Sequence, residues 1–322
     1  MIRQCQMLLL LAVIATAAGL ASAQQYPQRP VRTIVAYPPG GSTDIIARII
    51  GQKLTERLGQ TFIVDNRAGA AGMIGAEIVA RATPDGHTLM VADSPFVVNP
   101  SVFARVPYDP IRDFTPIALV GSSPLILVVP ASSPAQSLAD FIKLAKTQPG
   151  KYTIASAGTG ASSHVVAELF KMRAGVNLTH VPYKGLGPAL AEVTGGQVDS
   201  IFSSIPAALQ LVRTGKLRAL GICTKKRMAA VSEIPTIEEG GVPDFEAFIW
   251  YGYQGPAGMP KHVVDKLSVE IARAAELPDV KERFAGMGLE TMILMPNAFR
   301  PFIAQELKKW GDVVKAANIK AE

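Results

Sequence analysis

The sequence has little cysteine and, beyond its first residues, no long apolar run. Of its two cysteines, Cys5 lies inside an N-terminal apolar stretch, so Cys223 has no partner for an internal disulfide in the rest of the chain. After that stretch, no segment reaches the roughly 20 uncharged apolar residues that a membrane-spanning helix needs. Internal repeats of about 20–50 residues, typical of solenoids and propellers, are also missing. The chain must therefore rely on an ordinary buried core.

Several motifs of cofactor and metal chemistry are missing as well. The phosphate-binding pattern that ends in Gly-Lys-Ser/Thr does not occur. Gly158 and Gly160 form a Gly-x-Gly pair, but Ser163 stands where the dinucleotide fingerprint requires its third glycine. No metal-ligand spacing links the four histidines, which are His87, His164, His180 and His262. We therefore expect neither a metal nor an organic cofactor.

The composition is that of a globular protein with a mild basic excess. The chain has 322 residues, 48% of them apolar and 18% charged, with a net charge of +6. This length suggests about two domains. The basic residues are scattered rather than gathered on one segment, which argues against a nucleic-acid partner. The excess favours anionic ligands.

The first 23 residues predict a secretory signal peptide. Arg3 precedes an apolar run at residues 7–20, and Ala21-Ser22-Ala23 fits the small-x-small rule for cleavage after Ala23. A membrane anchor is the alternative, but the run is shorter than a bilayer span. Because the mature chain would lack disulfides, we expect it in the bacterial periplasm.

Strand-like and helix-like segments alternate along the chain, which predicts an α/β fold with mainly parallel sheets. We expect strands at residues 31–36, 62–64, 89–92, 125–129, 152–156, 198–202, 217–222 and 245–253. We expect helices at residues 45–58, 73–82, 138–146, 163–172, 188–194, 207–213, 262–275, 278–286 and 296–317.

Two irregular stretches, residues 120–124 and 240–244, divide this pattern into two lobes. Lobe I would be discontinuous, with residues 24–123 and 245–322, and lobe II would hold residues 124–244. Both stretches contain glycine and proline, so we expect them to act as a hinge that closes the lobes on a ligand in the cleft between them.

The loop at residues 37–44 joins the end of a strand to the start of a helix. Free backbone N–H groups and the positive end of the helix dipole meet there, which favours an anion site. The glycines allow a ligand to approach the backbone, Gly41 being expected to need special backbone angles, and Ser42 and Thr43 add hydroxyl donors. The alternative is a plain turn in which Ser42, Thr43 or Asp44 caps the helix.

The loop at residues 157–164 repeats the arrangement of strand, glycine-rich turn and helix. Two such loops on two lobes would face each other across a cleft, each holding a carboxylate of a small ligand. His164 lies at this mouth. Three weaker candidates also follow strand ends: Ser94, Tyr183 and Ser203. The aromatic residues Trp250, Tyr251 and Tyr253 fit core or hinge packing.

A secreted α/β serine hydrolase is the competing hypothesis. Gly160-Ala161-Ser162-Ser163-His164 begins like the Gly-x-Ser-x-Gly elbow but ends in histidine, which disfavours Ser162 or Ser163 as a nucleophile.

Together these motifs resemble the Bug family, the substrate-binding proteins of tripartite tricarboxylate transporters. The matching segments run through the chain in order: Tyr26-Pro27 with Arg29-Pro30, Pro38-Pro39-Gly40-Gly41-Ser42-Thr43-Asp44, Val64-Asp65-Asn66-Arg67-Ala68-Gly69-Ala70 with Gly72 and Gly75, Pro84-Asp85-Gly86-His87-Thr88-Leu89, Tyr108-Asp109-Pro110 with Asp113-Phe114, Gly158-Thr159-Gly160 with Ser162-Ser163-His164, and Val181-Pro182-Tyr183-Lys184-Gly185.

The resemblance implies a two-lobed periplasmic receptor that closes on a small carboxylate and delivers it to a membrane permease with one large and one small subunit. A ligand sensor for a signalling partner is the alternative, and we expect a monomer. Carried over by motif, the ligand contacts would be Gly41, Ser42, Thr43, Thr159, Gly160, Ser162 and Ser163. Tyr37 would add a hydroxyl where many relatives have Phe. Ser203, where many relatives carry Asp, disfavours an amino-acid ligand.

Overall fold

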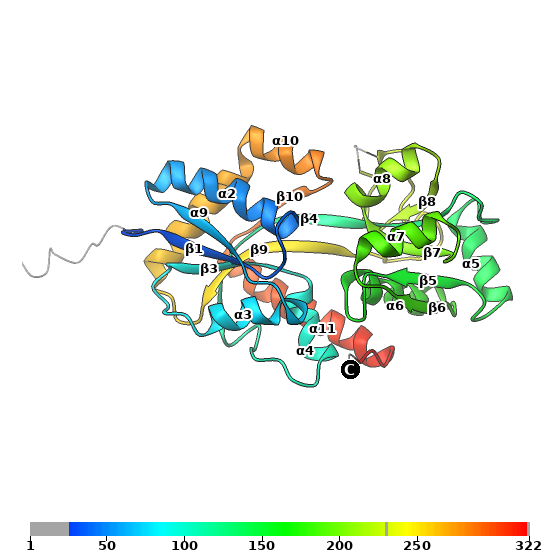
Figure 1. Cartoon of the computed structure of the whole chain (residues 1–322), viewed down its shortest axis with the longest axis horizontal. Helices are drawn as coiled ribbons and strands as arrows, with labels where there is room; N and C mark the ends of the chain where they lie inside the picture. Colours follow the sequence, from blue (N-terminus) through cyan, green and yellow to red (C-terminus); the bar gives the residue numbers. More distant parts are fainter. Residues whose placement is uncertain (1–25, 229–230, 321–322) are drawn as a thin grey trace, which may run out of the picture.

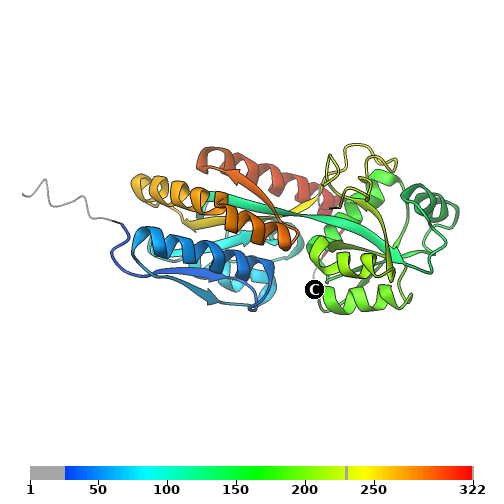
Figure 2. The ribbon, with the colours of Figure 1, turned by 90° about the horizontal axis from the view of Figure 1, so that it is seen from above.

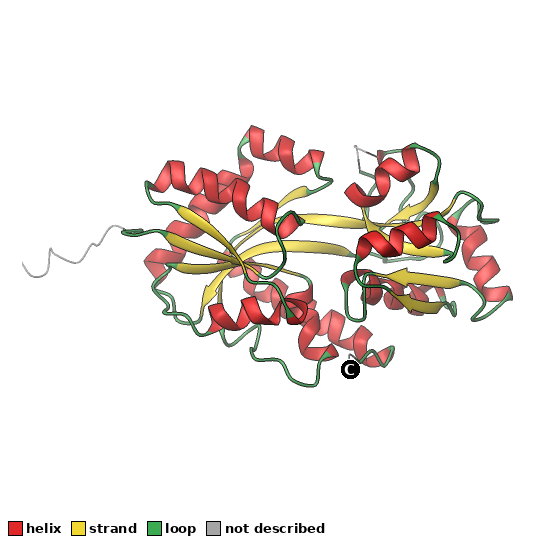
Figure 3. Cartoon of the chain, in the orientation of Figure 1, coloured by secondary structure: helices red, strands yellow, loops and turns green. Residues whose placement is uncertain are grey.

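The computed structural model describes residues 26–228 and 231–320. The predicted signal peptide and its cleavage site lie outside the described residues. Figure 1 shows two α/β lobes side by side along the longest axis, joined by two long strands. Helices flank the sheet of each lobe on both faces, as Figure 3 shows by colour.

Lobe I contains three parallel strands in the order β2-β1-β3, followed by antiparallel β9, β4 and β10. Its parallel strands are β1 (Val31–Val35), β2 (Phe62–Asn66) and β3 (Thr88–Asp93), and β10 covers Glu290–Leu294. One face carries α2 (Ser42–Leu58), α9 (Lys261–Glu276) and α10 (Pro278–Gly286). The other carries the short helix η1 (Ala70–Gly72), α3 (Met73–Ala80), α4 (Pro95–Val102) and α11 (Pro296–Ala316).

Lobe II contains a second parallel group in the order β7-β5-β6, and β7 and β8 pair antiparallel with β4. Its strands are β5 (Thr153–Ser156), β6 (Thr179–Pro182), β7 (Ser200–Ser204) and β8 (Leu217–Ile222). Its helices are α5 (Leu138–Thr147), α6 (Ser162–Ala174), α7 (Leu186–Thr194) and α8 (Ile205–Arg213).

Two antiparallel strands, β4 (Phe114–Pro130) and β9 (Phe248–Pro256), connect the lobes, as the view from above makes clear (Figure 2). Gly121 pairs with Tyr251 and Pro124 with Phe248. The expectation of an irregular stretch at residues 120–124 was therefore wrong. This segment reads as a turn because of its glycine, serines and proline. It is nevertheless extended, because β9 pairs along it and its Ser122 and Ser123 are buried.

The second predicted crossover, at residues 240–244, packs on lobe II. A Cβ on Gly240 would clash with Leu138 at the start of α5. The backbone N–H of Ala247 still bonds to the carbonyl of Cys223 in this lobe, and β9 starts one residue later. The chain thus crosses back to lobe I through the first residues of β9 and not through the stretch at residues 240–244. The exact domain boundaries stay a prediction.

The buried core is continuous across the crossing. One apolar cluster includes Ile34 and Phe96 of lobe I, Phe170 and Phe202 of lobe II, and Trp250 of β9. Helix α11 also spans the two lobes, because it packs against α4 of lobe I and α6 of lobe II. Sequence patterns missed α4, which contains Pro95 and Pro100, as well as β10 and the first half of β4.

Candidate functional site

Helix α2 begins at the end of the β1 loop without a side-chain cap. Its N-cap residue, Gly41, has no side chain, and the first backward bond runs from the Ile45 N–H to the Gly41 carbonyl, 3.0 Å away. The N–H groups of the first turn, beginning with Ser42, therefore have no partner within the helix. The carboxylate of Asp44 accepts a bond from the Gly40 N–H instead and holds the loop in place.

The carboxylate of Asp44 is held in place by side chains outside the loop, those of Arg48 and Asn66. Arg48 donates to both carboxylate oxygens, and the Asn66 side chain donates to Oδ1 at 2.9 Å. Burial alone would raise the pKa of Asp44, but the hydrogen bonds from Arg48, Gly40 and Asn66 outweigh it and lower the pKa. Asp44 thus stays ionised and stabilises the conformation of the loop through its hydrogen bonds. The alternative in which Ser42, Thr43 or Asp44 simply caps α2 fits poorly, because no side chain caps the helix.

Helix α6 of lobe II begins in the same way. Its N-cap residue is Ala161, which cannot cap with its side chain. Gly158 and Gly160 adopt φ angles of 135° and 78°, which glycine tolerates best. The Ser163 hydroxyl accepts a bond from the Ala157 N–H at 2.9 Å, so this serine closes the turn from inside. The start of α6 is a second uncapped helix N-terminus.

Two stacked histidines lie behind this turn. The rings of His164 and His180 are 3.7 Å apart and nearly parallel. His164 Nδ1 accepts the Gly160 N–H at 3.1 Å, and His180 Nε2 lies 2.6 Å from the Ser156 hydroxyl. Burial, the neighbouring ring and Lys171 lower the pKa of His164 to about 3, while burial and Lys171 lower that of His180 to about 4. Both rings are therefore neutral near pH 7 and support the turn.

The two helix starts open onto one cleft of about 550 Å³ between the lobes. The cleft is lined by six of the residues predicted from the sequence: Tyr37, Gly41, Ser42, Thr43, Ser162 and Ser163. Lobe I also contributes Pro38, Pro39, Asp93, Pro95 and Tyr251, and lobe II contributes Ala157, Ala161, Leu186, Phe202 and Ser204. Leu125 and Ile249 of the crossing strands complete the lining.

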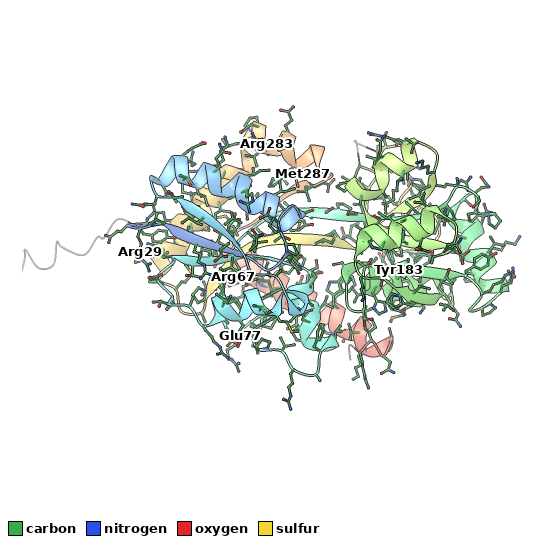
Figure 4. The ribbon with its side chains drawn as sticks, in the orientation of Figure 1. Arg29, Arg67, Glu77, Tyr183, Arg283 and Met287 are labelled. Carbon is green, nitrogen blue, oxygen red and sulfur yellow. The ribbon has the colours of Figure 1, made fainter. Side chains whose placement is uncertain are left out.

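The other predicted site residues lie outside this lining. The Ser94 hydroxyl accepts the Trp250 N–H at 3.2 Å and donates to the Phe248 carbonyl, which ties α4 to β9. Ser203 is fully buried and donates to the Ser204 carbonyl. Figure 4 places Tyr183 on lobe II, in the loop between β6 and α7.

Thr159, Gly160 and His164 belong to the turn itself and not to the cleft lining. Gly160 approaches lobe I, because a Cβ there would lie 3.0 Å from Val102 of α4. This residue therefore marks a close contact between the lobes.

Asp93 and Tyr251 line the cleft but were not among the predicted ligand contacts. Asp93 stands in the weaker candidate loop from which Ser94 was selected, and Tyr251 was assigned to core or hinge packing. Asp93 ends β3, and the Tyr37 hydroxyl donates to its Oδ1 at 2.8 Å. Burial raises the pKa of Asp93 to about 7, although hydrogen bonds from Tyr37 and Thr43 counteract part of the shift. Tyr251 of β9 lines the cleft together with Ser42, and burial raises the pKa of its phenol. The signal for Asp93 was its place at a strand end, directly before the predicted Ser94.

Within residues 26–228 and 231–320, no three histidine, cysteine, aspartate or glutamate side chains gather as a metal site. In the same part of the chain, no helix combines the length and apolar character needed to cross a bilayer. Cys223 is buried with a free thiol, whose pKa burial raises.

Two lobes with a cleft between them, crossed by a pair of strands and entered by two helix N-termini, define a solute-binding protein of the periplasmic type. The model of the tripartite tricarboxylate transporter family receptor matches residues 46–319. The chain therefore belongs to this family of substrate-binding receptors.

Relatives agree over nearly the whole length. Protein BugT of Bordetella pertussis is 37% identical over 320 residues, 98% of each chain. A structure from R. palustris solved with adipate is 34% identical, with a TM-score of 0.81, and covers 92% of this chain and 100% of that one. MatC of Rhodopseudomonas palustris, with bound malate, is 33% identical with a TM-score of 0.76 over 90% of this chain and 100% of its own.

Proposed function

We propose that this protein captures a small carboxylate in the periplasm and delivers it to a tripartite tricarboxylate-type permease. The observation that carries the proposal is the pair of uncapped helix N-termini, at Ser42 and Ser162, that open onto one cleft. A helix N-terminus offers free N–H donors and a positive dipole end to an anion. Relatives solved with adipate and malate support a carboxylate with two acidic ends.

A thermal-shift screen tests the ligand class directly. Adipate, malate, citrate and acidic amino acids would be compared with sugars and with divalent cations at one pH. A ligand at 100 times its Kd stabilises a protein by about 2.7 kcal/mol. We expect stabilisation by carboxylates. A screen in which only sugars or cations raise the Tm would reject the proposal.

We also propose that the receptor has no enzymatic activity. For the hydrolase alternative, Ser163 would need a free base, but His164 Nδ1 already accepts the Gly160 N–H. The Ser156–His180 contact has the form of a catalytic pair, yet Ser156 is fully buried. Incubation with generic esters and a serine-reactive probe should give no turnover and no labelling.

Export and assembly are parts of the same proposal. We expect cleavage after Ala23, which N-terminal sequencing of the periplasmic protein can test. The partner would be a permease with one large and one small subunit, and the receptor a monomer in solution. Co-purification with the membrane subunits in the presence of the ligand would separate this role from that of a sensor, which would instead associate with a signalling protein.

A further inference from the structure

A carboxyl group lies inside the cleft that we propose for carboxylates. Asp93 is only 9% exposed, and its side chain lies between the loop after β1, the first turn of α2 and strand β9. The Tyr37 hydroxyl donates to Oδ1 at 2.8 Å, and Thr43 lines the same cleft next to the carboxyl. Because Thr43 stands in the first turn of α2, Asp93 lies directly beside one of the two anion-attracting helix ends.

No cation is among the groups that act on this carboxyl. The titratable side chains around it are the phenols of Tyr37, Tyr108 and Tyr251, whose pKa values are raised mainly by burial, so they stay neutral. On α2 the charge of Asp44 is already compensated by Arg48. Across the cleft, α6 presents two serines, and His164 behind them is neutral.

An ionised Asp93 would oppose the ligand. Two unit negative charges a few ångström apart in a partly buried site repel each other enough to weaken binding by about two orders of magnitude. No described cation offsets this repulsion. A protonated Asp93, in contrast, can donate a hydrogen bond to a carboxylate oxygen and keep its acceptor contact with Tyr37.

We infer that Asp93 takes up one proton when the cleft binds a carboxylate, and that it then holds the ligand as a neutral acid. The inference rests on the proposed function and adds a specificity-determining residue to it. Burial supports it, since it raises the pKa of Asp93 to about 7, within the range where a bound anion can complete the protonation. Asp93 would thereby favour acids over ligands that carry an ammonium group.

The experiment is a calorimetric titration of adipate into the full mature chain between pH 6.0 and 8.5. Adipate is doubly ionised at the higher pH values, because ordinary carboxyl groups titrate near pH 4. We expect the affinity to be constant below about pH 7 and to fall by up to tenfold per pH unit above it. In buffers with different ionisation enthalpies, binding at pH 8 should take up close to one proton.

Three variants locate the effect. Asp93→Asn should bind adipate with an affinity that no longer depends on pH. Tyr37→Phe removes a hydrogen bond that lowers the pKa of Asp93, so the decline should move to higher pH. Glu306→Gln is the matched control. Glu306 is another buried carboxyl with a raised pKa, but it bonds to Trp310 outside the cleft, and its replacement should leave the profile unchanged.

The outcomes separate the two proposals. If dicarboxylates bind with a pH-independent affinity in the wild type, the role of Asp93 is rejected and the receptor function stands. If Asp93→Asn is folded by circular dichroism but binds no dicarboxylate at any pH, Asp93 is needed as an ionised group and the inference is overturned. Tighter binding of free aspartate at rising pH would overturn it too. If no carboxylate binds any variant, both proposals fail.

Discussion

Gly41 and Ser42 both line the cleft, and the space beside Gly41 is open. Gly41 has an extended backbone with φ of −77°, and a Cβ at this position would find no atom within 4 Å. The expectation that Gly41 needs special backbone angles was therefore wrong. Gly40 has the unusual φ, of 93°. A side chain at position 41 would instead occupy open space at the cleft.

This geometry predicts unequal effects for two neighbouring substitutions. Gly41→Val should fold normally but lose carboxylate binding, because its branched side chain fills the cleft mouth. Ser42→Ala should weaken binding by only about 0.5–1.5 kcal/mol, the value of one neutral hydrogen bond. Calorimetry on both variants, with circular dichroism as the folding control, checks this. Equal losses would show that backbone access is not what limits binding.

Asp93 also predicts a pH-dependent gain in stability. Its pKa is raised from 3.8 to about 7 by burial, so the folded state holds a proton that the unfolded state has lost. Ionising this group therefore destabilises the fold progressively as the pH rises from 4 to 7. Asp93→Asn should remove that penalty and stabilise the unliganded protein by up to about 4 kcal/mol at pH 8.

Urea unfolding at pH 3.5 and pH 8 measures the effect. The gain should be present at pH 8 and absent at pH 3.5, where the carboxyl is protonated in both states. A variant that is less stable than the wild type at pH 8 would show that the ionised carboxylate is a structural acceptor for Tyr37 and Thr43.

The sequence predicted the hydroxyls of the cleft as ligand contacts, whereas of the loop at residues 93–96 it predicted Ser94 and not Asp93. Ser42 and Ser162 follow glycine-rich turns, a local pattern that can be read without the fold. Asp93 becomes informative only when Tyr37 and Tyr251, more than 50 residues away on either side, are seen to enclose it. Burial by distant segments has no local signal.

Among the elements, the turn before α6 depends on two histidines from different segments. His164 holds the Gly160 N–H, and His180 of β6 stacks on it and contacts Ser156. Their pKa values of about 3 and about 4 lie below the ordinary 6.5, chiefly because burial disfavours the charged ring. Between about pH 4 and 6.5, these histidines are therefore protonated in the unfolded chain but neutral in the folded state.

Acid should therefore destabilise this turn. As the pH falls from 6.5 to 4, the buried His164 should lower the free energy of unfolding by up to about 3 kcal/mol, and the more exposed His180 by less, because solvent screens it. Replacing both rings, as in His164→Gln with His180→Gln, should flatten this part of the stability profile. Because Asp93 has the opposite slope over the same range, the measurement should use the Asp93→Asn background. An unchanged acid slope in the double variant would contradict the assignment.

The helices and strands show which local sequence patterns are sufficient to predict an element. Helices α2 and α6 were predicted because apolar periodicity begins directly after a glycine-rich turn. Strand β4 was predicted only from residue 125, because Pro116 and the stretch from Gly121 to Pro124 resemble turns. In the structure, register shifts against β9 accommodate these residues, and pairing on both sides keeps the strand extended. Long-range pairing overrode the local preference.

At the scale of the whole molecule, the proposed closure of the lobes would bend a pair of strands instead of two loose loops. The lobes touch at Gly160 and Val102 on one side and at Gly288 and Pro206 on the other. Helix α11 and the continuous core also span the crossing. A hinge of this kind would absorb small changes in several backbone angles and would limit the amplitude of the proposed closure.

Small-angle X-ray scattering should register this motion. The radius of gyration should fall when adipate, or another acid found by the thermal-shift screen, saturates the cleft. Gly41→Val with the same ligand serves as the control, since it should not bind and its scattering should stay constant. Binding confirmed by calorimetry without a change in the radius of gyration would mean that the cleft is formed before the ligand arrives.

The path of β4 and β9 also constrains the order in which the two lobes can fold. Lobe II uses one contiguous stretch, whereas the sheet of lobe I needs β9 and β10 from the last third of the chain. A chain that emerges from its N-terminus can therefore finish lobe II while β1, β2 and β3 still wait for their neighbours. The cleft needs Ile249 and Tyr251 of β9, so it can be completed only after that strand is in place, and α11 then ties both halves together.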